Sequence, residues 1–135
     1  MMTAEELLRS KGVKPTAQRV VITQFLLNNF EHPTADEVLE GVKERLPVAL
    51  SRATVYNTLN ALVEAGVIRE VTLEAGRVRY DANMVEHHHF MDVKSGKIID
   101  IPWEKVPQLC QSLGAEYTIH DYQITFYGEI RSDTA

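Results

Sequence analysis

Three consecutive histidines give the chain its clearest chemical signature. His87, His88 and His89 open the segment 87–91, which we predict to be a short β-strand, followed by a turn at 94–97 and a second strand. Because side chains alternate across a strand, His87 and His89 point to one face and His88 points to the other. Two imidazoles on one face, two residues apart, are well placed to bind one cation. The pattern therefore predicts a metal site centred on His87 and His89.

Two carboxylates and a third imidazole are the nearest candidates to complete this site. Asp100 belongs to a second predicted strand, 97–101, which should return beside the first after a turn. Asp81 and His32 are the other two candidates. A set of imidazoles and carboxylates suits Fe(II), Mn(II) or Zn(II), and it lacks the thiolates that favour zinc or Cu(I). The alternatives are a cluster of surface histidines and, for His32, a residue that merely precedes a helix.

His88 faces the opposite way and gives a weaker indication of a second metal site. Its candidate partners are Glu86, Glu104 and His120. A histidine with no role in metal binding is the preferred interpretation there. The single cysteine, Cys110, can form neither an internal disulfide nor a thiolate zinc site, and we expect it to be a buried helix residue.

Helix-start patterns dominate the first 66 residues. Two capping boxes and two further hydroxyl caps begin four predicted helices. Their predicted starts and ends are Thr3 and Gly12, Thr16 and Asn28, Thr34 and Pro47, and Ser51 and Gly66. The apolar period then changes to two, so that 67–73 and 77–80 predict a β-hairpin. Helices followed by a hairpin are the order of a winged-helix domain, with the hairpin as the wing.

The remaining residues have a mixed pattern. Trp103–Leu113 predicts a helix and Tyr117–Tyr127 predicts one or two strands. We therefore expect an α+β chain with a winged-helix domain at 1–80, a hinge at 81–86 and a small α/β domain at 87–135. A domain of about 50 residues is marginal alone, so the back half needs a metal or a second copy of itself.

The fourth predicted helix opens with residue types that can read DNA. Arg52 can bond guanine, Asn57 can bond adenine, and Tyr56 can pack against a thymine methyl group. Ser51 and Thr54 can bond phosphate. Further phosphate contacts are expected at the second helix, from Lys14, Gln18 and Arg19. The alternatives are a solvated helix surface and a winged helix that binds protein.

The net charge of −5 conceals an uneven distribution. Residues 1–80 carry ten basic and ten acidic residues, whereas 81–135 carry four basic and nine acidic residues. The acidity of the back half suits cation binding, and DNA binding needs a local basic face rather than a basic total. No apolar run approaches the roughly 20 residues of a membrane span, and the N-terminus lacks the order of a signal peptide. We expect a cytoplasmic protein with no membrane partner.

The chain resembles the ferric uptake regulator family from about Leu7 to Gly128. The matching motifs are Lys14-Pro15-Thr16-Ala17-Gln18-Arg19, His32-Pro33-Thr34-Ala35-Asp36-Glu37, Ala53-Thr54-Val55-Tyr56-Asn57-Thr58-Leu59, Gly66-Val67-Ile68, Arg79-Tyr80-Asp81, His87-His88-His89 and Gly96-Lys97-Ile98-Ile99-Asp100. The resemblance implies a DNA-binding winged helix, a C-terminal α/β dimerisation domain and a regulatory metal at the hinge. The implied metal ligands are His32, Asp81, His87, His89 and Asp100. Such a metal would fix the angle between the domains, and so the spacing of the two recognition helices of a homodimer on a palindromic operator.

Within this family, the chain is most similar to the peroxide-sensing branch. Aspartates at Asp81 and Asp100, and Asn57 in the recognition helix, are typical of that branch. The similarity implies Fe(II) or Mn(II) as the cofactor, with Zn(II) also binding in vitro. It also implies that peroxide oxidises His32 or His87 to 2-oxo-histidine in the iron form, with loss of the metal and release of DNA.

The chain departs from the family pattern at the structural zinc. Many members hold this zinc with two Cys-x-x-Cys pairs, but here the first pair is replaced by Asp92 and Ser95, and the segment 128–135 lacks the second. We therefore predict no structural zinc held by four cysteines. The dimer would instead rest on strand pairing and apolar packing. The candidate residues for that packing are Ile119, Ile124, Phe126 and Tyr127.

Three alternatives to a peroxide sensor follow from the same residues. An iron or zinc uptake regulator of the same family would bind DNA with metal and ignore micromolar peroxide. A metalloenzyme would use two histidines and a carboxylate, but five ligands leave little vacancy and no separate general acid or base is evident, so we predict no enzyme activity. A metal-free winged-helix module would keep full DNA affinity after chelation.

Overall fold

A computed structural model describes residues 2–29, 31–47, 49–107 and 113–131 of the chain. The chain divides into two units, Met1–Met84 and Val85–Ala135, which we call the front and back units. The division falls inside the segment 81–86 that the sequence predicts to be the hinge.

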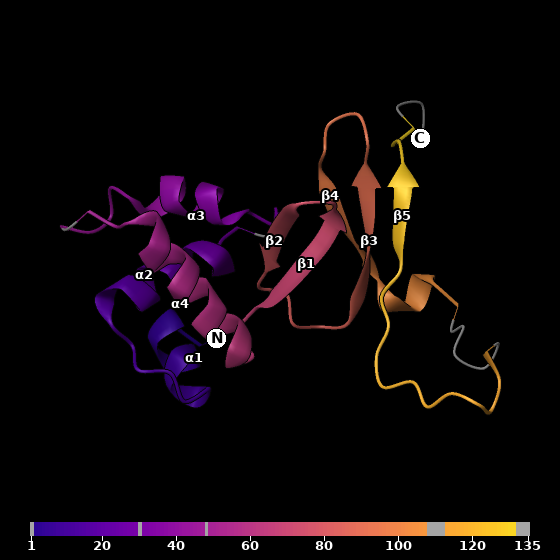
Figure 1. Ribbon diagram of the computed structural model, residues 1–135, viewed down its shortest axis with the longest axis horizontal. Helices are drawn as coiled ribbons and strands as arrows, with labels where there is room; N and C mark the ends of the chain where they lie inside the picture. The colour runs from indigo at the N-terminus through magenta and orange to yellow at the C-terminus, as the bar shows by residue number, and fades with distance from the viewer. Residues whose placement is uncertain (1, 30, 48, 108–112, 132–135) are drawn as a thin grey trace. The chain divides into compact units, whose positions relative to one another are not determined.

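Four helices open the front unit, and a hydroxyl side chain caps each of them. They are α1 (Ala4–Ser10), α2 (Ala17–Leu27), α3 (Ala35–Val42) and α4 (Arg52–Glu64) (Figure 1). In each case the cap hydroxyl accepts a hydrogen bond from a backbone N–H of the first turn, which has no partner within the helix. The caps are Thr3, Thr16, Thr34 and Ser51, so all four predicted helix starts are confirmed.

The third helix ends earlier than predicted. It stops at Val42, whereas the sequence indicated a helix that continues to Pro47. Gly41 in the last turn has a poor helix propensity. A hydrogen bond from the Arg45 N–H to the Val42 carbonyl then forms a turn in place of another helical turn.

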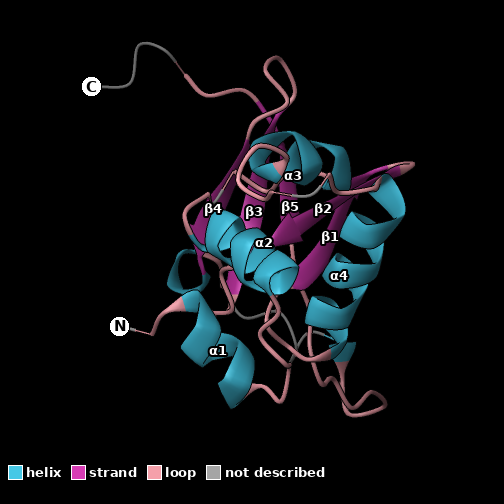
Figure 2. Cartoon of the chain, turned by 90° about the vertical axis from the view of Figure 1, so that its left-hand side faces the viewer, coloured by secondary structure: helices cyan, strands magenta, loops and turns pink. Residues whose placement is uncertain are grey.

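The core of the front unit combines apolar side chains from all four helices and the hairpin, and Figure 2 shows those helices in cyan. Its fully buried members include Leu8, Ile22, Leu26, Val38, Val55, Leu59, Leu62 and Ile68. Gly41 lets α2 and α3 approach, because a Cβ atom there would overlap the Phe25 ring. Burial of this core holds α4 on the rest of the unit.

The wing is an antiparallel hairpin of β1 (Arg69–Glu74) and β2 (Arg77–Asp81), as predicted. Gly76, with φ of +72°, provides the left-handed turn between them. The Tyr80 N–H donates to the Pro33 carbonyl over 2.9 Å. The end of β2 is therefore fixed beside the start of α3.

The back unit contains a sheet with the order β4-β3-β5 in its described part. β3 (His87–Asp92) pairs antiparallel with β4 (Ile98–Pro102) and parallel with β5 (Thr125–Gly128). The first two strands and their turn match the prediction closely. β3 is the central strand and is hydrogen-bonded on both edges.

Two predictions for the back unit are wrong in the described residues. Of the helix predicted at Trp103–Leu113, residues Trp103–Lys105 form the 3₁₀ turn η1, and the helix is interrupted at Val106, which precedes Pro107 and is extended, with φ of −113° and ψ of 124°. Residues 108–112 of this segment lie outside the described residues. Cys110 lies outside the described residues. The strand expected from Tyr117 begins only at Thr125. Thr125 pairs with His89, and β3 starts only two residues earlier, at His87, so β3 offers almost no backbone to the residues before Thr125.

None of the helices in the described ranges has the length and apolar character needed to cross a bilayer.

Candidate metal centre and recognition helix

Three side chains of the back unit form a cluster of metal-binding atoms. His87 and His89 share one face of β3, and their Nε2 atoms are 3.1 Å apart. Asp100 faces His89 in the β3–β4 register. Its Oδ1 atom lies 3.4 Å from the Nε2 of His87 and 3.7 Å from the Nε2 of His89. The alternation and the strand return that the sequence predicted are both present, and we call these three residues the back cluster.

The spacing of these atoms fits the ligands of a single ion. Ligands about 2.1 Å from one metal are about 3.0 Å apart in octahedral geometry and about 3.4 Å apart in tetrahedral geometry. The distance of 3.1 Å between the Nε2 atoms of His87 and His89 is close to the octahedral value. The distance of 3.4 Å from His87 Nε2 to Asp100 Oδ1 equals the tetrahedral value. Two imidazoles and one carboxylate form a donor set that suits Fe(II), Mn(II) or Zn(II).

A backbone carbonyl sets the tautomer of His87. The Nδ1 atom of this ring is in hydrogen-bond contact with the carbonyl of Val85. Since a carbonyl can only accept, Nδ1 carries a proton, and in the neutral tautomer of the ring the lone pair is on Nε2. The Nε2 lone pair therefore lies on the side of His89 and Asp100, as a ligand nitrogen must.

The front unit has a smaller set of similar donors, formed by His32 and Asp81, which we call the front pair. The His32 Nε2 atom lies 3.3 Å from the Oδ2 atom of Asp81. The other carboxylate oxygen of Asp81 accepts from the Asn83 N–H over 2.9 Å. One imidazole and one carboxylate are too few for a closed metal site, and the three donors of the back cluster are also fewer than four.

The backbone of His32 has an unusual conformation. Its φ of +59° lies in the left-handed region, which is uncommon for residues other than glycine and doubly so before a proline. Arg79 holds this conformation, because its Nη1 donates to the His32 carbonyl over 3.2 Å. Arg79 is itself fixed by Glu74, whose Oε1 accepts from Nη2 over 3.0 Å. Sequence reasoning missed this role for Arg79, although an arginine with a glutamate on the facing strand was visible.

His88 does not belong to the group of metal-binding side chains that contains His87 and His89. Its ring is fully buried, stacks on Trp103 with centroids 4.5 Å apart, and accepts from the Ile124 N–H over 2.9 Å. Burial, and then the nearby His89 and His87, lower its pKa. Glu86, Glu104 and His120 are exposed, and the described residues do not bring them together with His88 as a metal-binding group.

The residues predicted to read DNA lie on α4 or near the start of α2. Arg52, Tyr56, Asn57 and Gln18 are exposed, and Lys14 is exposed with its carbonyl accepting from Arg19 over 3.0 Å. Ser51 and Thr54 are engaged with each other, because their hydroxyl oxygens are 2.8 Å apart and Ser51 also caps the helix. Arg52 forms an ion pair with Asp36, which sequence reasoning did not predict.

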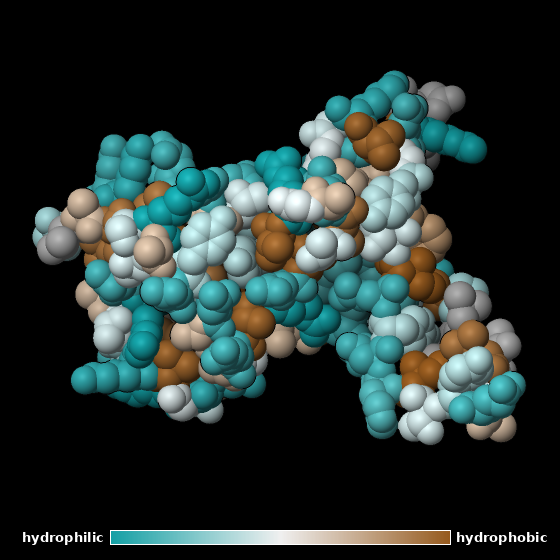
Figure 3. Space-filling model, viewed as in Figure 1, coloured by the Kyte–Doolittle hydropathy of each residue, from teal (hydrophilic) through white to brown (hydrophobic). Residues whose placement is uncertain are grey.

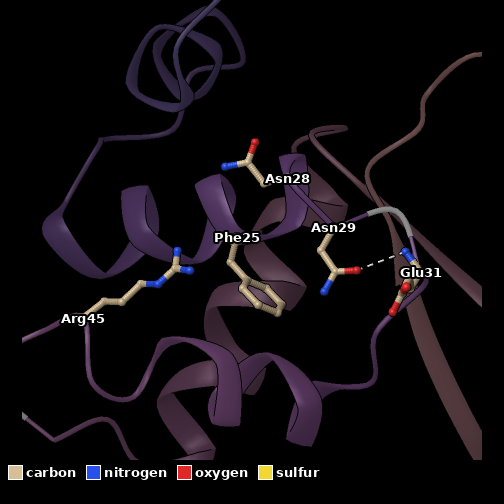
Figure 4. A pocket seen from close by; sticks show the side chains of 5 residues that line it. All are labelled: Phe25, Asn28, Asn29, Glu31 and Arg45. Atoms are coloured by element: carbon tan, nitrogen blue, oxygen red, sulfur yellow. Dashed lines mark hydrogen bonds between the residues drawn. The ribbon is translucent and has the colours of Figure 1, made fainter.

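A hollow of about 440 Å³ lies beside the end of α2 and is lined by Phe25, Asn28, Asn29, Glu31 and Arg45 (Figure 4). The Arg45 guanidinium lies 5.9 Å from the centre of the Phe25 ring. One carboxylate without an imidazole does not make a metal site, so this hollow is separate from the candidate metal chemistry.

Comparison with known proteins identifies the family. The model of the ferric uptake regulator family matches residues 10–127. The chain belongs to the ferric uptake regulator family. It is 33% identical over 124 residues to the peroxide-responsive repressor PerR of Staphylococcus epidermidis, covering 90% of this chain and 81% of that protein.

Solved structures agree with the fold. A ferric uptake regulator from Francisella tularensis with iron is 31% identical, with a TM-score of 0.72 over 90% of this chain and 94% of that one. The Campylobacter jejuni peroxide stress regulator is 25% identical, with a TM-score of 0.70 over 94% and 93% of the two chains. The predicted α+β architecture is thus confirmed. As a member of the ferric uptake regulator family, the chain is a DNA-binding transcription regulator and not an enzyme.

Proposed function

We propose that the chain is a metal-dependent repressor in which the front pair and the back cluster bind one Fe(II) or Mn(II) ion together. The spacing of the back-cluster donors carries this proposal. Each set is incomplete alone, and the two sets offer the same chemistry of imidazoles and carboxylates. Together they supply five ligands: His32, Asp81, His87, His89 and Asp100.

Such an ion would couple the two units. His32 lies between α2 and α3 in the unit that carries α4, whereas His87 and His89 lie in the central strand of the other unit. A ligand that needs both units favours the arrangements in which both sets face it. Metal occupancy would then control the spacing of the two α4 helices in a homodimer, and so its affinity for a palindromic operator.

The protein's own groups prepare these ligands. The Val85 carbonyl keeps the Nδ1 atom of His87 protonated, and Arg79 holds the backbone of His32. Partners of this kind orient ligands, and their loss typically weakens metal binding about 10- to 100-fold.

Hydrogen peroxide is the proposed stimulus that ends repression. Relatives that are 31–33% identical to the chain are named as peroxide-responsive repressors. Bound Fe(II) would supply the redox chemistry by which hydrogen peroxide oxidises a neighbouring ligand: the peroxide O–O bond breaks, one oxygen atom replaces the hydrogen on a carbon of the imidazole ring, and the other oxygen leaves as water. His32 and His87 are the proposed targets, and each would gain one oxygen atom as 2-oxo-histidine. An oxidised ring is a poorer ligand, so the metal leaves and DNA is released.

The proposed dimer uses the back unit. β5 is an edge strand of the described sheet, and an edge strand is a place where a second copy can add to a sheet. Apolar side chains are exposed on and around it, including Tyr117, Phe126, Tyr127 and Ile130. Figure 3 shows brown, hydrophobic residues reaching the surface in the region of β3 to β5. Their burial would stabilise the dimer without a zinc ion held by four cysteines.

The proposed DNA contacts divide by chemistry. Arg52, Tyr56 and Asn57 would read base edges from the first turns of α4. Phosphate contacts would come from Lys14, Gln18, Arg19, Ser51 and Thr54.

Operator binding with Fe(II), with Mn(II) and after chelation tests this function. We expect binding with either metal and weak binding without one. Micromolar peroxide should release DNA only in the iron form, with a gain of about 16 Da, one oxygen atom, on His32 or His87. Equal DNA affinity after chelation would refute metal control, and unmodified histidines would refute peroxide sensing. His32→Ala should abolish the metal response; an unchanged response would show that the front pair is not a ligand.

An iron, manganese or zinc uptake regulator is the second candidate. Similar solved structures include a zinc-bound manganese uptake regulator at 28% identity and the iron-containing regulator described above. Such a regulator would bind DNA with metal and keep it in micromolar peroxide, so the peroxide arm of the experiment separates the two.

A further inference from the structure

Arg52, the first residue of the predicted recognition helix α4, forms a two-bonded ion pair with Asp36 of α3. Arg52 is the first residue of α4, and Asp36 lies in the first turn of α3. The Arg52 Nε donates to Oδ1 of Asp36 over 2.9 Å, and Nη2 donates to Oδ2 over 2.6 Å. Two parallel bonds of this kind fix the plane of the guanidinium as well as its position.

This ion pair leaves one end of the guanidinium for a ligand. Of the five N–H donors of arginine, Asp36 takes one on Nε and one on Nη2. Of the other three, one on Nη1 and one on Nη2 form a second fork at the tip of the side chain. The Arg52 side chain is 66% exposed, so the tip is accessible. The Asp36 carboxylate, and next the Tyr56 phenol one turn along α4, raise the pKa of Arg52, so this fork stays charged.

The surroundings favour a neutral partner over an anion. Arg52 lines a hollow of about 650 Å³ between α3, α4 and the hairpin. The same hollow is lined by the carboxylates of Asp36, Glu37 and Glu70, against a single further cation, Arg77. A phosphate placed there would be repelled by these carboxylates. A guanine edge is uncharged and offers two acceptors, O6 and N7, that match an arginine fork.

We propose that Asp36 is a positioning residue that aims Arg52 at a guanine base instead of at the DNA backbone. The proposal rests on the DNA-binding function proposed above and deepens it by naming what sets base preference. Asp36 would lower the general attraction of this surface for phosphate and would restrict Arg52 to the one orientation that reads guanine.

Selection from a pool of random 30-base-pair duplexes by the manganese-loaded protein tests this role. The wild-type chain should select a G·C pair at one position of each half-site, with a preference of about 5- to 150-fold over the other pairs. Arg52→Ala should remove this preference. Asp36→Asn should reduce it at least threefold at the same position, while affinity for non-selected duplexes stays equal or rises. In the double variant the loss should match that of Arg52→Ala alone, because Asp36 acts through Arg52.

The chain provides a matched control in the ion pair of Arg9 and Glu5. That pair is similarly exposed, at 65% and 51%, and lies on α1. Glu5→Gln should leave the base preference unchanged.

Three results would overturn the proposal. Tighter operator binding by Asp36→Asn with the preference intact would mean that the carboxylate masks Arg52. A uniform loss of affinity in Arg52→Ala, with a salt dependence shallower by about one ion, would mean a phosphate contact. A guanine preference equal in all variants would remove Arg52 from base reading. Failure to select any duplex would instead refute the proposed function itself.

Discussion

Replacing Arg79 with methionine should loosen the backbone around His32. The Arg79 side chain is only 9% exposed and makes three hydrogen bonds, one to the His32 carbonyl and two to Glu74. Methionine keeps most of the apolar packing of the stem but none of these bonds. Glu74 is 31% exposed and can be hydrated again, so the main loss is at His32.

The size of the effect follows from that one carbonyl. A hydrogen bond from a charged donor contributes about 1.5–3 kcal/mol, and the His32 carbonyl is buried. We therefore expect the free energy of unfolding of the metal-free chain to fall by about 2 kcal/mol. For a unit of this size that is a decrease in melting temperature of about 8–16 °C.

Metal binding should weaken as well, because the left-handed conformation at His32 is no longer held. We expect Mn(II) affinity to fall about 10- to 100-fold, as for the loss of other groups that orient ligands. Urea unfolding of the metal-free protein and calorimetric titration with Mn(II) measure the two effects. Arg77→Met is the control, since Arg77 is exposed on the same strand and its loss should change stability by less than about 0.5 kcal/mol. If Arg79→Met matched that control in both measurements, our account of His32 would be wrong.

Three further predictions concern single groups. Thr34→Ala removes the capping box of α3 and should destabilise the chain by about 1 kcal/mol in urea unfolding; no change would mean that water replaces the cap. His88→Phe keeps a ring beside Trp103, so elemental analysis should find the same metal content per chain as in the wild type; a lower content would show that His88 is a ligand. Hydrogen bonding from the Lys94 backbone N–H holds the pKa of Asp92 below its usual 3.8. The folded state therefore favours the ionised carboxylate, so the stability difference between wild type and Asp92→Ala should be present at pH 6 and shrink below pH 3.8; a difference that is independent of pH would contradict this reasoning.

The sequence predicted what is encoded locally. Cap residues at Thr3, Thr16, Thr34 and Ser51 act on the turn that follows them, so the helix starts could be read directly. The cluster of imidazoles with Asp100 was also predictable, because strand alternation and a short turn determine which side chains meet.

Contacts between distant parts of the chain were not predictable in this way. Arg79 and His32 are 47 residues apart, and Arg52 and Asp36 are 16 apart, so neither pair leaves a periodic pattern. The errors in the back unit have a related cause. The residues before Thr125 have the composition of a strand, but the central strand offers little backbone for them to pair with.

The central position of β3 should keep the side chains of the back cluster in place when no metal is bound. A strand bonded on both edges opens only when the sheet around it opens, so its amide protons should be among the slowest to exchange with solvent in the back unit. His87 and His89 therefore belong to the segment of the back unit that we expect to be the last to unfold locally. An ion that dissociates and later returns would find these two rings still in place, and rebinding would not have to await refolding.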